Sequence, residues 1–353
     1  LNGGSGYQPG TSPAYSITGP SSQGLTVTGN LNVTTSGGVV RNDSSTRAVI
    51  TGTASFNTAG SASYGSVTLP NTDFQSTVNL TSVGTTSITD GAGSLTIGNS
   101  TINAQGALNA TELTLRATTT GGSSIAMASG AKVTVVPSVT NTTPQIALTS
   151  TSGGITYTGV GTMSFATLSS STTAVVTLSG DKDITVPAST ARGLSITTTG
   201  GSITTAGLSR TDATLKLATT GLGDITYNSN TLVTSATVDI QASNGKVTLG
   251  TLAAGSTSML VGGSSIIKAS GDVTIGADTG RIGFAAPSGV TIQSTGGQVA
   301  LSGAFSGNGT ITAASNVVLG TPDTSSKANI ASGTATMSAV NAAGNGSGTI
   351  VSY

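Results

Sequence analysis

The stretch from Val238 to Leu249 reads VDIQASNGKVTL, and the stretch from Val290 to Leu301 reads VTIQSTGGQVAL. In each, two runs of alternating apolar and other residues flank a short turn of small polar residues and Gly. Alternation with a period of two is typical of a β-strand with one buried face. Each stretch therefore predicts a strand, a tight turn and a second strand.

This module recurs along most of the chain. Further copies begin at residues 113, 146, 176, 194, 215 and 266, so successive copies start 18 to 33 residues apart, with a mean of about 25. A repeat of this length is typical of solenoids, in which each repeat packs only on its neighbours. Helix formers are scarce, since Glu112 is the only glutamate and Thr, Ser and Gly disfavour helix interiors.

Two topologies are compatible with such modules. A sandwich or propeller would pair the strands as antiparallel hairpins, which favour two-residue turns such as Asn244-Gly245. Most of the turns here are longer tracts of Ser, Thr and Gly. A parallel β-helix tolerates irregular turns, and its narrow aliphatic core needs few aromatic residues, which are 3% of this chain. We therefore expect an all-β fold, a parallel β-helix (β-solenoid) with irregular coils of about 25 residues.

The composition excludes several functions. The 353 residues include 66 Thr, 51 Ser and 51 Gly, but no His and no Cys, which rules out a Ser-His-Asp or Cys-His triad and an ordinary zinc site. Twelve basic residues balance twelve acidic ones, so no basic surface for nucleic acid is expected. The apolar runs are too short for a transmembrane helix. We expect no enzymatic activity, no cofactor, no nucleic-acid partner and no membrane insertion.

The ends of the chain differ from its middle. Residues 1–20 hold three of the nine prolines and are predicted to be an extended leading segment or linker. The β-helix is expected over 21–320. Residues 321–353 are rich in Ala, Ser and Gly and finish with the strand-like GTIVSY, which predicts either a terminal coil or a strand that pairs with another subunit.

A few acidic residues are candidate sites. Asp181 and Asp183 flank one lysine and would face the same side of a strand, so they are candidate calcium ligands or a carboxylate pair. The alternative is a solvated turn, which we favour. Asp272, Asp278 and Arg281 fall within one coil, and we interpret them in the same way. The other acids occur singly, roughly one per coil, whereas a polysaccharide lyase would concentrate them. No catalytic residue is predicted.

Two tyrosines end predicted strands. Tyr157 and Tyr227 could stack on a carbohydrate, but packing at the end of a buried row of side chains is the interpretation that we favour.

Several segments resemble the coil repeats of filamentous haemagglutinin-type secreted adhesins. They include ATVDIQASNGKVTLGTLAAGS, SIIKASGDVTIGADTGRIGF, GVTIQSTGGQVALSG and, at 93–117, GSLTIGNSTINAQGALNATELTLRA. The resemblance covers about 90–320 and rests on pattern and composition. It implies a right-handed parallel β-helix that is exported to the bacterial cell surface.

The surface pattern indicates self-association. Residues 133–180 contain no charged side chain, and the net charge of the whole chain is zero. Low charge favours association, and strand edges are normally protected by charged residues. We expect a secreted structural or adhesive protein that assembles into a fibre, sheath or layer, with host or matrix glycans as further partners. The alternative is a carbohydrate-active β-helix or a glycan-binding module.

Overall fold

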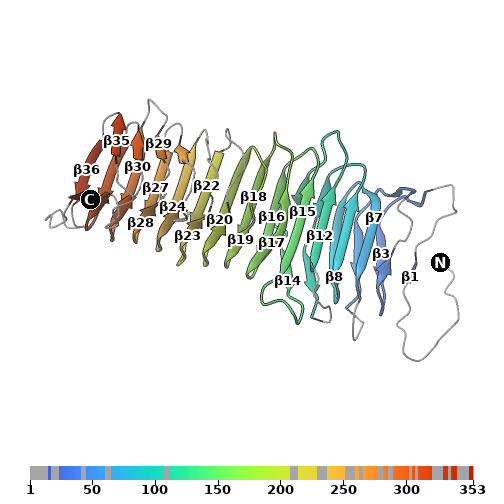
Figure 1. Ribbon diagram of the computed structural model, residues 1–353. Coiled ribbons are helices and arrows are strands. Elements are labelled where there is room, and N and C mark those ends of the chain that lie inside the picture. Colours follow the sequence, from blue (N-terminus) through green and yellow to red (C-terminus); the bar gives the residue numbers. More distant parts are fainter. Residues whose placement is uncertain are drawn as a thin grey trace. The chain divides into compact units, whose positions relative to one another are not determined.

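The computed structural model describes residues 24–40, 45–59, 65–105, 111–206, 214–228, 237–250, 265–276, 289–301 and 309–319, and strands at 15–16, 259–261, 281–284, 304–306, 329–332, 335–339 and 350–352. All regular elements in this part of the chain are β-strands, and their pairings are parallel (Figure 1). The predicted β-solenoid is confirmed, with about 10 turns and coils of about 23 residues. No helix among the described residues could cross a membrane.

The chain divides into two compact units. The first holds residues 1–160 and 164–166, and the second holds 161–163 and 167–353. Strand β17 (Met163–Ser169) contributes residues to both. Each unit is described separately.

The first unit has two parallel sheets. In one sheet, neighbouring strands are β2 (Thr26–Val27), β5 (Ala48–Ile50), β7 (Val67–Phe74), β9 (Thr86–Asp90), β12 (Leu113–Ala117) and β15 (Gln145–Ser150), with β1 (Tyr15–Ser16) on β4 (Val39–Val40) and β4 on β7. The other sheet holds β3 (Leu31–Thr34), β6 (Ala54–Asn57), β8 (Thr77–Ser82), β10 (Leu95–Ile97), β11 (Ser100–Asn103), β13 (Ile125–Met127), β14 (Val133–Val136) and β16 (Ile155–Val160). Strand β8 pairs with both β10 and β11, which makes these coils irregular.

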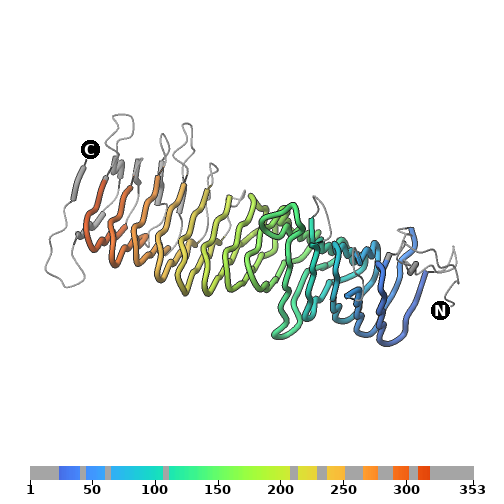
Figure 2. The backbone as a smooth tube through the Cα atoms, turned by 90° about the horizontal axis from the view of Figure 1, so that it is seen from below, coloured from blue at the N-terminus to red at the C-terminus, as the bar shows by residue number. Residues whose placement is uncertain are grey.

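The second unit repeats two strands per coil. Its long-strand sheet contains β18 (Val175–Gly180), β20 (Gly193–Thr198), β22 (Thr214–Thr219), β24 (Val238–Ala242), β27 (Ser265–Ala269), β30 (Val290–Ser294), β33 (Gly309–Ala313) and β36 (Ala335–Ala339). Its short-strand sheet contains β19 (Ile184–Val186), β21 (Ile203–Thr205), β23 (Ile225–Tyr227), β25 (Val247–Leu249), β28 (Val273–Ile275), β31 (Val299–Leu301), β34 (Val317–Leu319) and β37 (Ile350–Ser352). Figure 2 shows the coils that hold β18 to β34 stacked one on the next, from yellow-green to red-orange.

A third sheet joins the later coils. It consists of β26 (Met259–Val261), β29 (Arg281–Phe284), β32 (Ala304–Ser306) and β35 (Asn329–Ser332). Strands β35, β36 and β37 belong to the predicted tail, and each pairs in parallel with the corresponding strand of the preceding coil. At the other end, β1 lies within the predicted leading segment, whose remaining residues are outside the described part of the chain.

The core consists of aliphatic rows that run from coil to coil. Ile196, Leu217, Ile240, Ile267, Ile292 and Ile311 occupy one row of the long-strand sheet, and each is at most 4% exposed. Ile184, Ile203, Ile225, Val247, Val273, Val299 and Val317 form the matching row of the short-strand sheet. Burying one such side chain contributes about 1.5–3 kcal/mol. The alternation in the sequence places these residues inward and leaves the intervening ones on the surface.

Candidate functional site

A column of polar residues follows one corner of the second unit. We call it the corner ladder. Its members directly precede the short strands and are Asp183, Ser202, Asp224, Lys246, Asp272, Gln298 and Asn316. Side chains of the ladder accept backbone amides of the next coil: Ser202 N donates to Asp183 Oδ1 (2.8 Å), Asp224 N to Ser202 Oγ (3.1 Å), Lys246 N to Asp224 Oδ1 (2.8 Å) and Gln298 N to Asp272 Oδ1 (3.0 Å). The ladder therefore satisfies backbone donors where the chain turns.

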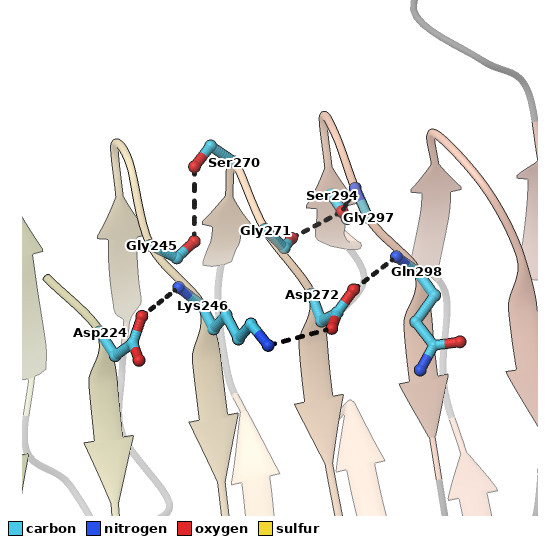
Figure 3. Close-up of polar contacts among 9 residues, drawn as sticks. All are labelled: Asp224, Gly245, Lys246, Ser270, Gly271, Asp272, Ser294, Gly297 and Gln298. Atoms are coloured by element: carbon cyan, nitrogen blue, oxygen red, sulfur yellow. Dashed lines mark hydrogen bonds and ion pairs between the residues drawn. The ribbon is translucent and has the colours of Figure 1, made fainter. Parts of the chain in front are cut away.

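Lys246 interrupts this pattern, because an ammonium group can only donate. Its Nζ lies 3.6 Å from Asp272 Oδ2 instead, and the two side chains are 63% and 37% exposed (Figure 3). An ion pair so accessible to water contributes little stability. The stacking of these two coils therefore depends on hydrogen bonds between their backbones, such as those from Gly271 N to Gly245 O (2.9 Å) and from Val247 N to Asp272 O (3.0 Å), rather than on this pair of charges.

Glycines stack directly beside the ladder. Gly201, Gly223, Gly245, Gly271 and Gly297 each precede a ladder residue. A Cβ atom on Gly245 would overlap the carbonyl oxygen of Gly223, and a Cβ atom on Gly297 would lie 2.8 Å from Asp272 N. Successive turns thus approach too closely for a side chain, which explains why Gly occupies this position.

Hydroxyl groups bind the carbonyl oxygens of the same turns. Ser294 Oγ donates to Gly271 O (2.7 Å) and accepts from Gly297 N (2.9 Å), while Ser270 Oγ donates to Gly245 O (3.5 Å) (Figure 3). Short hydroxyl side chains are well suited to such local bonds with the backbone. The Ser and Thr residues of the turns therefore hold one coil on the next.

The structure places the two calcium candidates in one turn but gives them different partners. Asp181 Oδ1 accepts Gly161 N (2.7 Å), from earlier in the chain, and Asp183 Oδ1 accepts Ser202 N (2.8 Å), from the following coil. Both carboxylates therefore act as backbone acceptors. Among the described residues, no group of three or more acidic side chains could hold a metal ion. Asp278 lies outside them, as does the side chain of Arg281.

Glu112 has a structural role that the sequence did not reveal. It is fully buried, and its Oε1 accepts Ser138 N (2.9 Å) and Asn141 Nδ2 (2.6 Å), while Oε2 accepts Gln145 N (2.5 Å). Burial acts to raise the pKa of the carboxyl group, but these hydrogen bonds outweigh burial and lower the pKa below its ordinary value. The ionised glutamate thus holds the loop between β14 and β15.

Asp90, at the end of β9, is also fully buried. Its carboxylate accepts the backbone amides of Ala92 (2.9 Å), Gly93 (2.8 Å) and Phe74 (3.2 Å). Burial nevertheless raises the pKa of Asp90 above its ordinary value, with a smaller contribution from the negative charge of Asp73. A buried acid with a raised pKa can mark a catalytic site, but here the carboxylate is occupied by three backbone amides.

Both tyrosines point into the core. Tyr157 and Tyr227 are fully buried, as expected for packing within the aliphatic rows. The Tyr157 ring meets the Phe165 ring edge to face, with centroids 5.9 Å apart. The Tyr157 hydroxyl group has no hydrogen-bond partner among the residues that the structure describes, and burial raises its pKa. Neither ring is available to a carbohydrate.

The surface of the second unit has a shallow hollow with polar walls. It measures about 260 Å³ and is lined by Gln241, Ala242, Ser243, Lys268, Ser270 and Thr295, which come from three successive coils. Hydroxyl groups, an amide and one ammonium group could together contact a polyol or an anion. The hollow lacks a carboxylate among its lining residues.

No family model, curated protein or solved structure matches the chain. The resemblance to filamentous haemagglutinin-type adhesins, with the right-handed coil that it implies, therefore stays a prediction.

Proposed function

We propose that this chain is a non-enzymatic structural or adhesive β-solenoid of the cell exterior, which assembles with copies of itself into a fibre, sheath or layer. The observation that supports this proposal most is the bonding of the carboxylates. The structure describes eight acidic residues, and six of them accept backbone amides within the fold: Asp90, Glu112, Asp181, Asp183, Asp224 and Asp272. The other two, Asp73 and Asp239, accept the side-chain amides of Gln75 and Gln241. Six of the eight described acids thus hold backbone of the coils in place, and the other two bond side chains two residues further along the chain.

The outward side chains support self-association. Residues 133–180 are uncharged, and their exposed apolar members include Val139 (70% exposed) and Val175 (46%). A surface of hydroxyl groups, amides and scattered aliphatic groups has little charge repulsion against a copy of itself. Such contacts depend only weakly on salt.

Particle size as a function of concentration tests the proposal. Light scattering and sedimentation should show association that increases with concentration and persists from low to high ionic strength at neutral pH. Particles that stay monomeric at every concentration would contradict it. Dissociation at modest ionic strength would show that charge pairs, rather than the neutral faces, supply the contact.

Glycan binding is the second candidate, favoured by the polar hollow beside Lys268. A glycan array probed with the purified chain tests it. Binding that Lys268→Gln and Ser270→Ala both weaken would support a glycan contact there, and an array without signal would exclude the candidate.

A further inference from the structure

The outward face of the long-strand sheet carries a pair of opposite charges on adjacent strands. Ser195, Lys216, Asp239, Ile266 and Thr291 align in register on β20, β22, β24, β27 and β30. All five point outward, because the neighbouring positions along each strand are buried. Lys216 and Asp239 therefore lie side by side on adjacent strands, whose backbones are about 4.8 Å apart.

These two charges do not neutralise one another within the chain. Asp239 Oδ1 accepts Gln241 Nε2 (2.7 Å), which turns the carboxylate along its own strand. Lys216 forms no ion pair with any described residue. The next position in the column is Ile266, which is 42% exposed, and Thr291 and Thr310 extend the column without charge. This column thus presents one positive charge, one negative charge and an exposed aliphatic group, and Lys268, two residues further along β27, adds a second exposed positive charge to the same face.

We propose that this face is an interface with a second copy of the chain, related by a two-fold axis that lies in the interface, parallel to the strands and midway between Lys216 and Asp239. A two-fold contact uses the same patch on both partners. The axis would bring Lys216 against Asp239 of the second copy, and Asp239 against Lys216 of the second copy, so both charges are neutralised. It would also place Ile266 over Ser195 of the second copy. A two-fold axis placed between any other two adjacent positions of this column would not set opposite charges of the two copies against each other.

The inference rests on the proposed function and deepens it, since it names one surface through which copies associate. A two-fold contact joins copies in pairs, so a fibre, sheath or layer needs at least one further contact between the pairs. The neutral part of the face supplies most of the contact area. The charge pair fixes an arrangement in which the two coil stacks run in opposite directions, because like charges brought together across an interface are strongly unfavourable. An arrangement with the two stacks parallel and in register would set Lys216 against Lys216 of the second copy and is therefore disfavoured.

Two single charge reversals provide the test. Lys216→Asp places two acids opposite each other in the two-fold contact, and Asp239→Lys places two bases opposite each other. Each variant alone should associate at least about tenfold more weakly than the wild-type chain at low ionic strength. A 1:1 mixture of the two variants should associate as the wild type does, because every acid of the first variant at these two positions then faces a lysine of the second.

Mixing separates an interface from an effect within one chain. If a charge reversal acted only by disturbing its own fold, the mixture would be as weak as the single variants. Lys182→Asp is the matched control, since Lys182 is an exposed lysine of the same unit that lies in the turn between β18 and β19 and not on a strand of this face. Circular dichroism and urea titration should show both single variants folded.

The outcomes also distinguish this inference from the proposed function. A wild-type chain that stays monomeric overturns both. A wild-type chain that associates, with single variants that associate equally well, overturns only the two-fold interface. A mixture that associates as weakly as its two component variants also overturns the two-fold interface, whereas a mixture that recovers the association of the wild type supports it.

Discussion

Replacement of Glu112 by Gln gives the sharpest test of the buried polar contacts. The carboxylate accepts three hydrogen bonds, from Ser138 N, Asn141 Nδ2 and Gln145 N, and has no exposed surface. A glutamine can keep its oxygen in the Oε1 position, with the first two donors. Its NH₂ group then faces the amide of Gln145, so two donors meet and neither has an acceptor.

The expected loss follows from this geometry. A buried donor left without an acceptor costs about 1–3 kcal/mol, and a hydrogen bond to a charged group is worth about 1.5–3 kcal/mol. We expect Glu112→Gln to lower the free energy of local opening at residues 138–145 by about 2–3 kcal/mol. Because each 1.4 kcal/mol is a factor of ten, amide exchange there should accelerate by roughly 30- to 150-fold. Glu112→Ala removes both acceptor oxygens and should cost more.

Hydrogen–deuterium exchange of Ser138 and Gln145 measures the effect directly. Exchange reports local opening and does not require the whole chain to unfold in one step. Asp239→Asn is the matched control, since it removes the same charge from an acid that, among the described residues, accepts a side-chain amide and no backbone amide. Exchange at both amides that stays within about threefold of the wild type would refute the reasoning, because the lost acceptor would then carry no free energy.

Three further predictions concern Tyr157, Gly245 and the titration of Glu112. Tyr157→Phe removes a buried hydroxyl without a partner, so the free energy of unfolding should rise by about 1 kcal/mol in urea titration, and a clear loss would contradict this. Gly245→Val drives a side chain into the carbonyl group of Gly223 and should lower the free energy of unfolding, measured by thermal melting, by more than about 2 kcal/mol. The control is Gly121→Val, which should lower the free energy of unfolding by less than about 0.5 kcal/mol, because Gly121 has open space around it. The pKa of Glu112 is lower in the folded chain than in the unfolded chain, so its contribution to stability is complete above the unfolded pKa and is lost as pH falls through the folded pKa. The protection of residues 138–145 from amide exchange should therefore fall below about pH 4. Glu112→Gln should show no such acid loss.

The contribution of Asp90 to stability depends on pH in the opposite sense to that of Glu112. The raised pKa of Asp90 means that ionisation is less favourable in the folded chain, so its contribution to stability is lost as pH rises from the unfolded pKa to the folded one. The acid sensitivity of the described carboxylates is therefore not uniform. Measurements that follow individual segments are needed to separate the two residues.

The strands could be predicted from alternation alone, but the ladder could not. The apolar positions Val238 and Ile240 are buried, and the turn after them occurs where the sequence predicts it. The bond from Lys246 N to Asp224 Oδ1 joins residues 22 apart, and the bond from Gln298 N to Asp272 Oδ1 joins residues 26 apart. Because coil length varies, these partners are recognisable only once the register is known.

The sequence nevertheless contains a trace of these contacts. Acids occur about once per coil, and several follow a glycine and precede an alternating run, as in Gly223-Asp224 and Gly271-Asp272. Such single acids do not form the cluster that a lyase site needs, and their spacing coincides with the corner ladder. No sequence pattern marks the contacts of Glu112, since its partners lie 26 to 33 residues away, in the loop before β15 and at the first residue of that strand.

Electron microscopy of the purified chain tests the central claim most directly. Negatively stained samples at neutral pH, over a range of protein concentrations, should contain regular filaments, sheaths or layers built from associated copies. Isolated single particles at every concentration would contradict self-assembly, and with it the account of the neutral surface as a contact between copies.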